Sequence, residues 1–353
     1  MAVTQDPMAE VAGDVCIPIS VAQQMEFCHE RGWTDGLPVV PATRELVDDM
    51  LEAARLEPDT VLAEMPSRNV AVTAAKAAIN AVMAGCKPEY MPVVAAAVKA
   101  LGTPEFGLHH VASGHSGAAV MVLVNGPIAK KLGINATKNV FGPGARANAS
   151  IGRALRLVLL NCLRYRPDTA DAATFGTPGK YTCCIAENEE SHPWGPWHVE
   201  RGFDAADSTV TLVAASTMTQ IWTFGTAEQL LLAVADALSF IGSIAITSQT
   251  PGAAIFGGEH TELLRRDGWT KARIREFVLT KSGRTVAELK RAGRLDGAIV
   301  DGDDITMHHA LREPEDLMVL CAGSPIGLLS MVLPGFGGSR EAGRSPAIRI
   351  EAG

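Results

Sequence analysis

Cys86 stands at the junction of two expected helices, where a thiol can be chemically active. Gly85 is placed to end one helix and Pro88 to open the next, so Cys86 lies just ahead of a helix N-terminus. Free backbone N–H groups and the positive end of the helix dipole favour the thiolate there, and Lys87 adds a cation. We expect Cys86 to be a nucleophile or a thiol acid/base. The alternative is a small apolar residue packed in a helix corner.

Histidines in two segments are candidates for proton transfer. His109 and His110 lie in a loop before a buried strand, and His260 follows a second expected strand beside Glu259. Polar residues at strand ends tend to face a cleft in α/β proteins. We expect His109 or His110, and His260 with Glu259, to act as acid/base groups. Glu259 alternatively begins and caps the following helix.

A glycine loop that opens a long apolar helix is a candidate anion cradle. Gly142 and Gly144 let the backbone approach a ligand, and Arg146 offers a planar fork for a carboxylate or phosphate. Asn148 in the same segment and Asn125 at the end of the first buried strand complete the predicted substrate-binding set. The loop is neither a Walker A nor a Gly-x-Gly-x-x-Gly motif, so we predict no nucleotide cofactor. The alternative is a tight strand-to-helix turn.

Two groups of residues would serve a metal-dependent enzyme. Alternation along an extended segment puts Glu187 and Glu189 on one face, and a carboxylate and imidazole set suits a divalent metal. The alternative for each group is a solvated loop. The two candidate metal sets are Glu187, Glu189 and His192, and the three histidines His109, His110 and His115.

Length and composition set the class of protein that must position these residues. The chain has 353 residues, 47% of them hydrophobic and 20% charged, which predicts one large α/β unit or two compact domains. A formal charge of −8 with no basic run argues against nucleic acid as a partner. The N-terminus lacks the pattern of a signal peptide, and the long apolar stretches carry acids, so no membrane partner is expected. Seven cysteines without a C-x-x-C pair favour a reduced, cytoplasmic setting.

The chain repeats itself in the order of its elements. The stretch GAAVMVLVNGPIAKKLG (117–133) and the stretch GAAIFGGEHTELLRRDG (252–268) both run from strand to turn to basic-tailed helix. We predict two related α/β halves in tandem, with a mixed sheet and a cleft between them. The expected divisions are an N-terminal entry segment (1–66), a first half (67–206), a second half (207–335) and a tail (336–353).

Three motifs carry a resemblance to a known family. They are TDGLPVVPAT (34–43), INAVMAGCKPEYMPVV (79–94) and NVFGPGARANASIGRAL (139–155). They resemble a bacterial family of soluble hypothetical proteins, sometimes encoded near small proteins with a selenocysteine- or cysteine-containing UGSC motif. The resemblance implies no activity and no residue roles. The proximity of these genes would be consistent with thiol or redox-linked chemistry.

These observations predict a cytoplasmic enzyme that cleaves a small polar or anionic substrate. The reaction would be of the hydrolase or lyase type, with Cys86 as thiolate and histidines as acid/base groups, and without a cofactor. One alternative is a metal-dependent hydrolase or hydratase. Another is a non-catalytic protein that binds a small ligand or serves assembly. In the last alternative, Gly- and Ala-rich helices would serve packing in an oligomer. We expect the protein to form a homo-oligomer.

Overall fold

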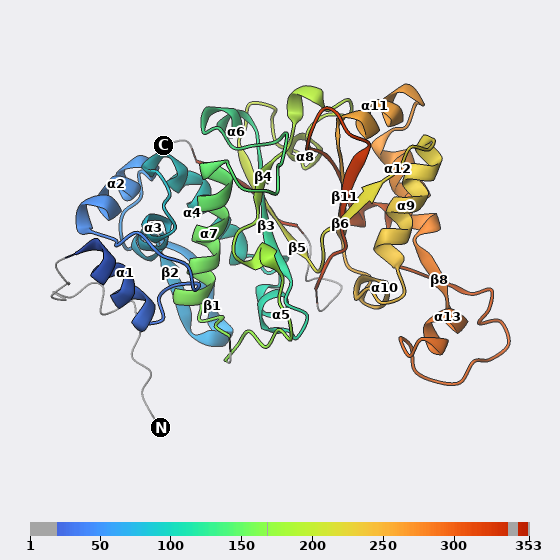
Figure 1. Ribbon diagram of the computed structural model, residues 1–353, viewed down its shortest axis with the longest axis horizontal. Helices are drawn as coiled ribbons and strands as arrows, with labels where there is room; N and C mark the ends of the chain where they lie inside the picture. The colour runs from blue at the N-terminus through green and yellow to red at the C-terminus, as the bar shows by residue number, and fades with distance from the viewer. Residues whose placement is uncertain (1–19, 168, 338–344, 352–353) are drawn as a thin grey trace.

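Two four-stranded mixed sheets form the centre of the molecule, and this confirms the predicted α/β fold with two halves. This computed structural model describes residues 20–167, 169–337 and 345–351. The sheets face each other, and helices cover the outer face of each one (Figure 1). The first sheet has the order β12 (Ala347–Arg349), β5 (Thr209–Ala215), β3 (Ala119–Asn125), β4 (Cys184–Ala186). The second has the order β10 (Leu317–Cys321), β7 (Gly252–Phe256), β11 (Leu329–Leu333), β6 (Thr219–Trp222).

The two sheets share one pairing pattern, which supports the tandem repeat seen in the sequence. In the first sheet β3 pairs in parallel with β4 and antiparallel with β5. In the second sheet β7 pairs in parallel with β10 and antiparallel with β11. Each parallel pair requires a helical crossover. The main crossover helices are α7 (Arg146–Asn161) and α12 (Lys271–Lys281).

The halves exchange their edge strands, so the predicted divisions are wrong at two places. The chain passes from β5 in the first sheet to β6 at the edge of the second, and later from β11 back to β12 at the edge of the first. The predicted boundary at 207 therefore cuts β5 from its own sheet, and the predicted tail contributes β12. An apolar strand pattern does not reveal which sheet receives the strand. The rest of that tail, 338–344 and 352–353, lies outside the described residues.

The predicted entry segment is part of the first half rather than a separate unit. Its first nineteen residues lie outside the described ones. The rest contains α1 (Val21–Glu30), α2 (Arg44–Ala54) and β1 (Val61–Met65). Strand β1 pairs antiparallel with β2 (Val70–Thr73), across the expected boundary at 66. Helix α2 begins after Thr43, whose hydroxyl accepts a hydrogen bond from the Leu46 N–H.

Helices make up the outer layers on both sides (Figure 1). Helix α8 (Trp197–Glu200) lies on the segment between β4 and β5. The remaining helices of the first half are α3 (Ala74–Met83), α4 (Met91–Leu101), α5 (Leu108–Ser113) and α6 (Pro127–Lys131). Those of the second half are α9 (Ala227–Ser239), α10 (Ala245–Ser248), α11 (Gly258–Arg266) and α13 (Val286–Arg291). The second half also contains an antiparallel pair of short strands, β8 (Gly283–Thr285) and β9 (Met307–His309). Within the described residues, none of these helices combines the length and the apolar character needed to cross a bilayer.

Alternation along the strands separates the apolar interior into layers. On β3, Met121 and Leu123 face the second sheet, whereas Val122 and Val124 face the helices of the first half. Residues of β7 and β10 meet Met121 and Leu123 from the other side. The space between the sheets is thus largely a packed apolar core. Two recesses between the halves open at its margins.

The three sequence motifs pack together around α7. Arg153 binds Asp35 through two hydrogen bonds of 2.8 and 2.9 Å and also donates to the Leu37 and Pro38 carbonyls. Arg146, the first residue of the helix, donates two hydrogen bonds to the Gly85 carbonyl. The motifs therefore fix one another in place through two arginines of a single helix.

Candidate active site

Asn125 and Glu187 lie at the carboxyl ends of β3 and β4, where α/β proteins commonly bind ligands. Asn125 ends β3 and Glu187 directly follows β4. Both side chains point between the sheets, because they continue the alternation of Leu123 and Ile185. The Asn125 Nδ2 atom donates to Glu187 Oε2 over 2.6 Å, and both residues are buried. A buried carboxylate thus begins a polar cluster at the junction of the halves.

Glu187 is further bound by an imidazole and by a backbone N–H. His192 Nε2 lies 2.8 Å from Glu187 Oε1, and both side chains are buried. The Trp197 N–H donates to Glu187 Oε2 over 2.8 Å. The other ring nitrogen of His192, Nδ1, accepts a hydrogen bond from the Trp194 N–H over 3.3 Å. Because Nδ1 accepts, His192 carries its proton on Nε2, which lies close to Glu187 Oε1 without a hydrogen bond between the two atoms.

Glu189 and His198 form a second carboxylate–imidazole pair, nearer to solvent. Glu189 Oε1 accepts hydrogen bonds from Asn125 Nδ2 over 2.9 Å and from the Gly126 N–H over 2.7 Å. The Glu189 side chain is 27% exposed, and the buried His198 ring places Nδ1 at 3.7 Å from Oε1. The Asn125 amide thus donates a hydrogen bond to the carboxylate of each pair. We call Asn125, Glu187, Glu189, His192 and His198 the acid–imidazole cluster.

Several buried polar atoms around this cluster have no hydrogen-bond partner among the described residues. Thr209 is the register partner of Asn125 on β5, and Thr211 is the partner of Leu123, so both hydroxyls lie on the same inter-sheet face. Buried polar groups in proteins are nearly always hydrogen-bonded, so such a concentration is typical of a place that binds a polar ligand or water. The unpartnered atoms are Asn125 Oδ1, Glu187 Oε1, His192 Nε2, Trp197 Nε1, both ring nitrogens of His198, Thr209 Oγ1 and Thr211 Oγ1.

Residues of the second half bind the segment between β4 and β5, which contains most of the acid–imidazole cluster. The Asn188 N–H, between the two glutamates, donates to the Cys321 carbonyl at the end of β10 over 2.7 Å. Lys271 and Arg275 of α12 both pair with Glu200 at the end of α8, Lys271 over 2.8 Å. These contacts fix α8, and therefore His198, against the second half. The cluster depends on both halves for its shape.

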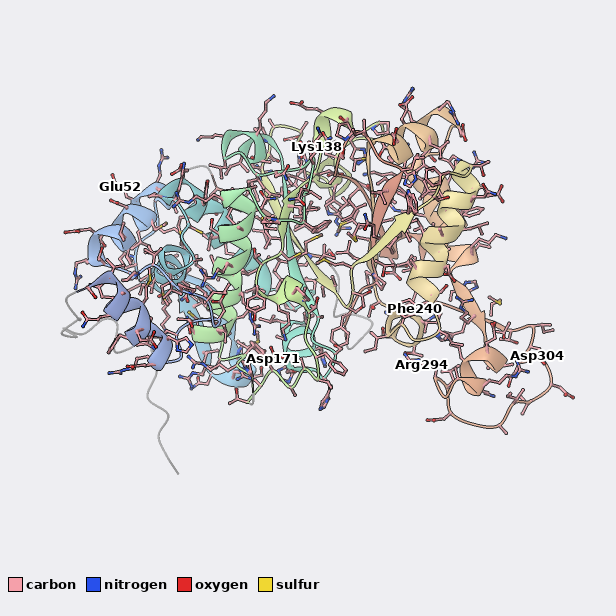
Figure 2. All side chains as sticks on the ribbon, viewed as in Figure 1. Glu52, Lys138, Asp171, Phe240, Arg294 and Asp304 are labelled. Atoms are coloured by element: carbon pink, nitrogen blue, oxygen red, sulfur yellow. The ribbon has the colours of Figure 1, made fainter. Side chains whose placement is uncertain are left out.

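A recess of about 270 Å³ opens at the junction of the halves. It is lined on one side by Asn139–Gly142 and on the other by residues of the second half, including Gly257 and Gly323. Lys138, beside its first wall, lies between the two halves in Figure 2. Cys321, which anchors Asn188, comes two residues before Gly323. The recess and the cluster therefore share the loop that follows β10.

Cys86 does not have the properties predicted for it. It lies beside the start of α7, since Ser150 and Arg146 both act on its thiol. However, the side chain is buried, and burial raises its pKa to about 12 in spite of the lowering by Ser150 and Arg146. Gly85, with φ of +82°, ends α3 as predicted. The Cys86 N–H then closes the helix on the Ala81 carbonyl. The thiol is neutral at physiological pH, so the predicted activated thiolate is wrong.

His260 is a buried structural contact rather than a residue at the end of a strand. Strand β7 ends at Phe256, and His260 lies in the first turn of α11. Its Nε2 donates to the Thr223 carbonyl over 3.1 Å and its Nδ1 accepts from the Ser330 hydroxyl over 2.7 Å. Burial lowers its pKa, so the ring is neutral. The predicted partner Glu259 instead accepts a hydrogen bond from the Gly327 N–H over 2.6 Å.

The remaining histidine candidates lie far from the cluster. His109 and His110 are exposed on α5, which precedes β3, whereas Asn125 ends it, so the length of the strand separates them (Figure 1). Seven residues of strand span roughly 20 Å. His115 is exposed in the same segment. Among the described residues, no three His, Cys, Asp or Glu side chains are placed to hold a metal ion. Neither predicted metal set is therefore assembled, and Glu187 faces His192 directly.

The predicted anion cradle is divided by the fold. Gly142 lines the recess at the junction of the halves, whereas Arg146 is bound to the Gly85 carbonyl. Asn148 is buried and bonds Asn135 and the Cys184 carbonyl, which ties α7 to β4. Gly144 has a φ of +126°, a conformation that favours glycine. Of the predicted substrate-binding residues, only Asn125 is part of the acid–imidazole cluster.

His198, Trp197, Thr209 and Thr211 were not predicted as site residues. A weak signal existed for the threonines, because they alternate with Val210 and Leu212 on one strand and so share the opposite face. His198 lies on a helix of only four residues, which has no periodicity to place it. No family model and no curated protein matches this chain, so the site rests on its geometry.

Proposed function

We propose that this protein is a cytoplasmic enzyme that cleaves a small polar molecule by proton transfer at the acid–imidazole cluster. The observation that carries the proposal is the presence of two carboxylate–imidazole pairs held by one amide, that of Asn125. An imidazole beside a carboxylate is a common general acid/base unit. The carboxylate orients the ring and stabilises it when it gains a proton.

His198 is the acid/base residue of the proposal. Its ring is fully buried and neither ring nitrogen is hydrogen-bonded within the described residues, so both nitrogens are free to bond a substrate or a water molecule that enters the cluster. Glu189, at 3.7 Å, stabilises the positive charge that His198 acquires when it accepts a proton. Asn125 and the Gly126 N–H prevent this carboxylate from swinging away. Proton removal from water leads to hydrolysis, and proton removal from the substrate leads to a lyase-type cleavage.

Glu187 and His192 are positioning residues in this proposal. Glu187 fixes Asn125 on one side and the start of α8 on the other, and the His192 ring lies 2.8 Å from its second oxygen. The polar groups that face the same space bind the substrate by hydrogen bonds, and we assign this role to Asn125 Oδ1, Thr209 and Thr211. This assignment replaces the thiolate expected from the sequence with imidazole chemistry.

The test is turnover of a panel of small amides, esters, hydroxy acids and amino acids, followed by proton NMR. Loss of a general acid/base residue lowers rates by about 10²- to 10⁴-fold, so His198→Asn should show this loss on any compound that the wild type converts. Glu190→Gln is the matched control, because Glu190 is exposed and its carboxylate pairs with Lys130 instead. Equal rates for His198→Asn and wild type would rule out the proposed role. Binding of a compound at the cluster without conversion would favour the binding-protein alternative.

A further inference from the structure

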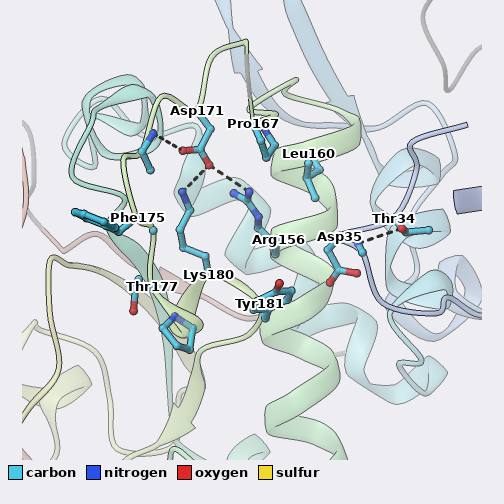
Figure 3. A pocket seen from close by; sticks show the side chains of 14 residues that line it. Thr34, Asp35, Arg156, Leu160, Pro167, Asp171, Phe175, Thr177, Lys180 and Tyr181 are labelled. Atoms are coloured by element: carbon cyan, nitrogen blue, oxygen red, sulfur yellow. Dashed lines mark hydrogen bonds and ion pairs between the residues drawn. The ribbon is translucent and has the colours of Figure 1, made fainter. Parts of the chain in front are cut away.

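A second cavity lies in the first half and shares no lining residue with the acid–imidazole cluster. Its volume is about 700 Å³, in the range of sites for small organic ligands. Three segments enclose it: the turn Thr34–Gly36, the α7 residues Arg156 and Leu160, and the stretch that leads to Tyr181 (Figure 3). One sequence motif, 34–43, therefore lines this cavity, and the α7 residues that line it follow the end of another motif, 139–155.

A buried carboxylate holds two cations at the wall of this cavity. Asp171, only 4% exposed, binds Lys180 Nζ over 2.5 Å and Arg156 Nη2 over 3.2 Å through the same oxygen, Oδ2. Its other oxygen accepts a hydrogen bond from the Ala173 N–H. Figure 3 shows the two cationic side chains converging on Asp171 from different elements. One negative charge is thus matched by two positive charges.

The other acidic side chain that lines the cavity does not neutralise this surplus. Asp35 is committed to Arg153, which binds both of its oxygens. Asp171 engages one nitrogen of the Arg156 guanidinium and one ammonium hydrogen of Lys180. Both residues therefore retain N–H donors in the cavity. Fixed cations with spare donors favour a carboxylate or a phosphate.

The rest of the wall suits an apolar or aromatic ligand body. Phe175 is 97% exposed and Tyr181 is 49% exposed, and both line the cavity. Leu160 and Pro167 add apolar surface. An aromatic ring that is almost fully exposed on a soluble chain leaves its faces free to stack on a ligand.

From this arrangement we infer a second ligand site, for a small organic anion with an aromatic body. Its carboxylate or phosphate binds Lys180 and Arg156, and its ring packs against Phe175 and Tyr181. Asp171 positions the two cations rather than contacting the ligand. This site goes beyond the proposed function, and either can be refuted without the other.

Calorimetric titration of the full chain with benzoate, phenyl phosphate, inorganic phosphate and neutral benzamide tests the inference. Benzoate or phenyl phosphate should bind at least about tenfold more tightly than benzamide, and the binding should weaken with added salt. Lys180→Gln should weaken both aromatic anions about tenfold or more, whereas Lys131→Gln, an exposed lysine outside the cavity, should leave binding unchanged. The absence of measurable binding by either aromatic anion, or equal binding by Lys180→Gln and wild type, would overturn the site.

Phe175→Ala provides a test that does not depend on the charged network. The side chain is almost fully exposed, so its removal should not disturb folding. The variant should bind phenyl phosphate less tightly and inorganic phosphate as the wild type does. A variant that binds both as the wild type does would refute the aromatic part of the site, and the ligand class would reduce to a simple anion.

Discussion

Asn125 donates its amide to Glu187 over 2.6 Å, so two parallel neighbouring strands end in a shared hydrogen bond. The same nitrogen also donates to Glu189. A single amide therefore links two carboxylates, each of which faces an imidazole. Two strand ends and one loop are enough to bring these groups together.

The turn after β3 controls the position of Glu189. Gly126 has a φ of +87°, and a Cβ atom there would lie 2.0 Å from the Asp207 carbonyl oxygen. Gly126→Ala should therefore destabilise the fold by about 3 kcal/mol or more, because strain and a backbone clash add. Gly133→Ala is the control, since Gly133 also has a positive φ but open space around it. It should lose only about 1–2 kcal/mol. Urea midpoints measure both, and equal losses would show that the clash at Gly126 is relieved.

The Cys86 thiol should be inert in the folded protein. Burial raises its pKa to about 12, so almost no thiolate exists at pH 8, and the side chain is shielded as well. Iodoacetamide should leave Cys86 unmodified in the native state and label it after unfolding in urea, as mass spectrometry of the peptides would show. Rapid native labelling of Cys86 would restore the thiolate hypothesis.

His260 should make stability depend on pH. Burial lowers its pKa in the folded chain, so on acidification the unfolded chain takes up a proton before the folded one does. The stability present above the unfolded pKa of about 6.5 is then lost as the pH falls toward the folded value. His260→Gln should be less stable than wild type at pH 7.5 by about 1–3 kcal/mol, through lost hydrogen bonds. The difference in urea midpoint between wild type and His260→Gln should become smaller as the pH is lowered from 7.5 to 5. A difference that stays constant would contradict a neutral buried ring.

Local features of the fold are predictable from the sequence, because they depend on neighbouring residues. Gly85 ends α3 where the sequence indicates. The similar order of elements in 117–133 and 252–268 predicts two related halves. The exchange of β6 and β12 between the sheets is not predictable in this way, because it depends on pairing between segments far apart in the chain.

The candidate site was predicted in separate pieces. Asn125 was predicted as a substrate-binding residue, and Glu187, Glu189 and His192 as metal ligands. These residues come together because β3 and β4 pair in parallel, and no local sequence pattern specifies that pairing. The prediction of an activated Cys86 thiolate is wrong for the same reason. Its helix junction is a local feature, whereas its surroundings include the distant α7.

The most direct test of the account is a double-mutant cycle on Glu189 and His198. With a compound that the wild type converts, kcat/KM is measured for Glu189→Gln, His198→Asn and the variant that carries both changes. Residues that act as one catalytic unit lose activity non-additively. We predict that the double variant is no slower than His198→Asn alone, and that Glu190→Gln remains like wild type. Losses that multiply in the double variant, or no loss in either single variant, would contradict the proposed centre.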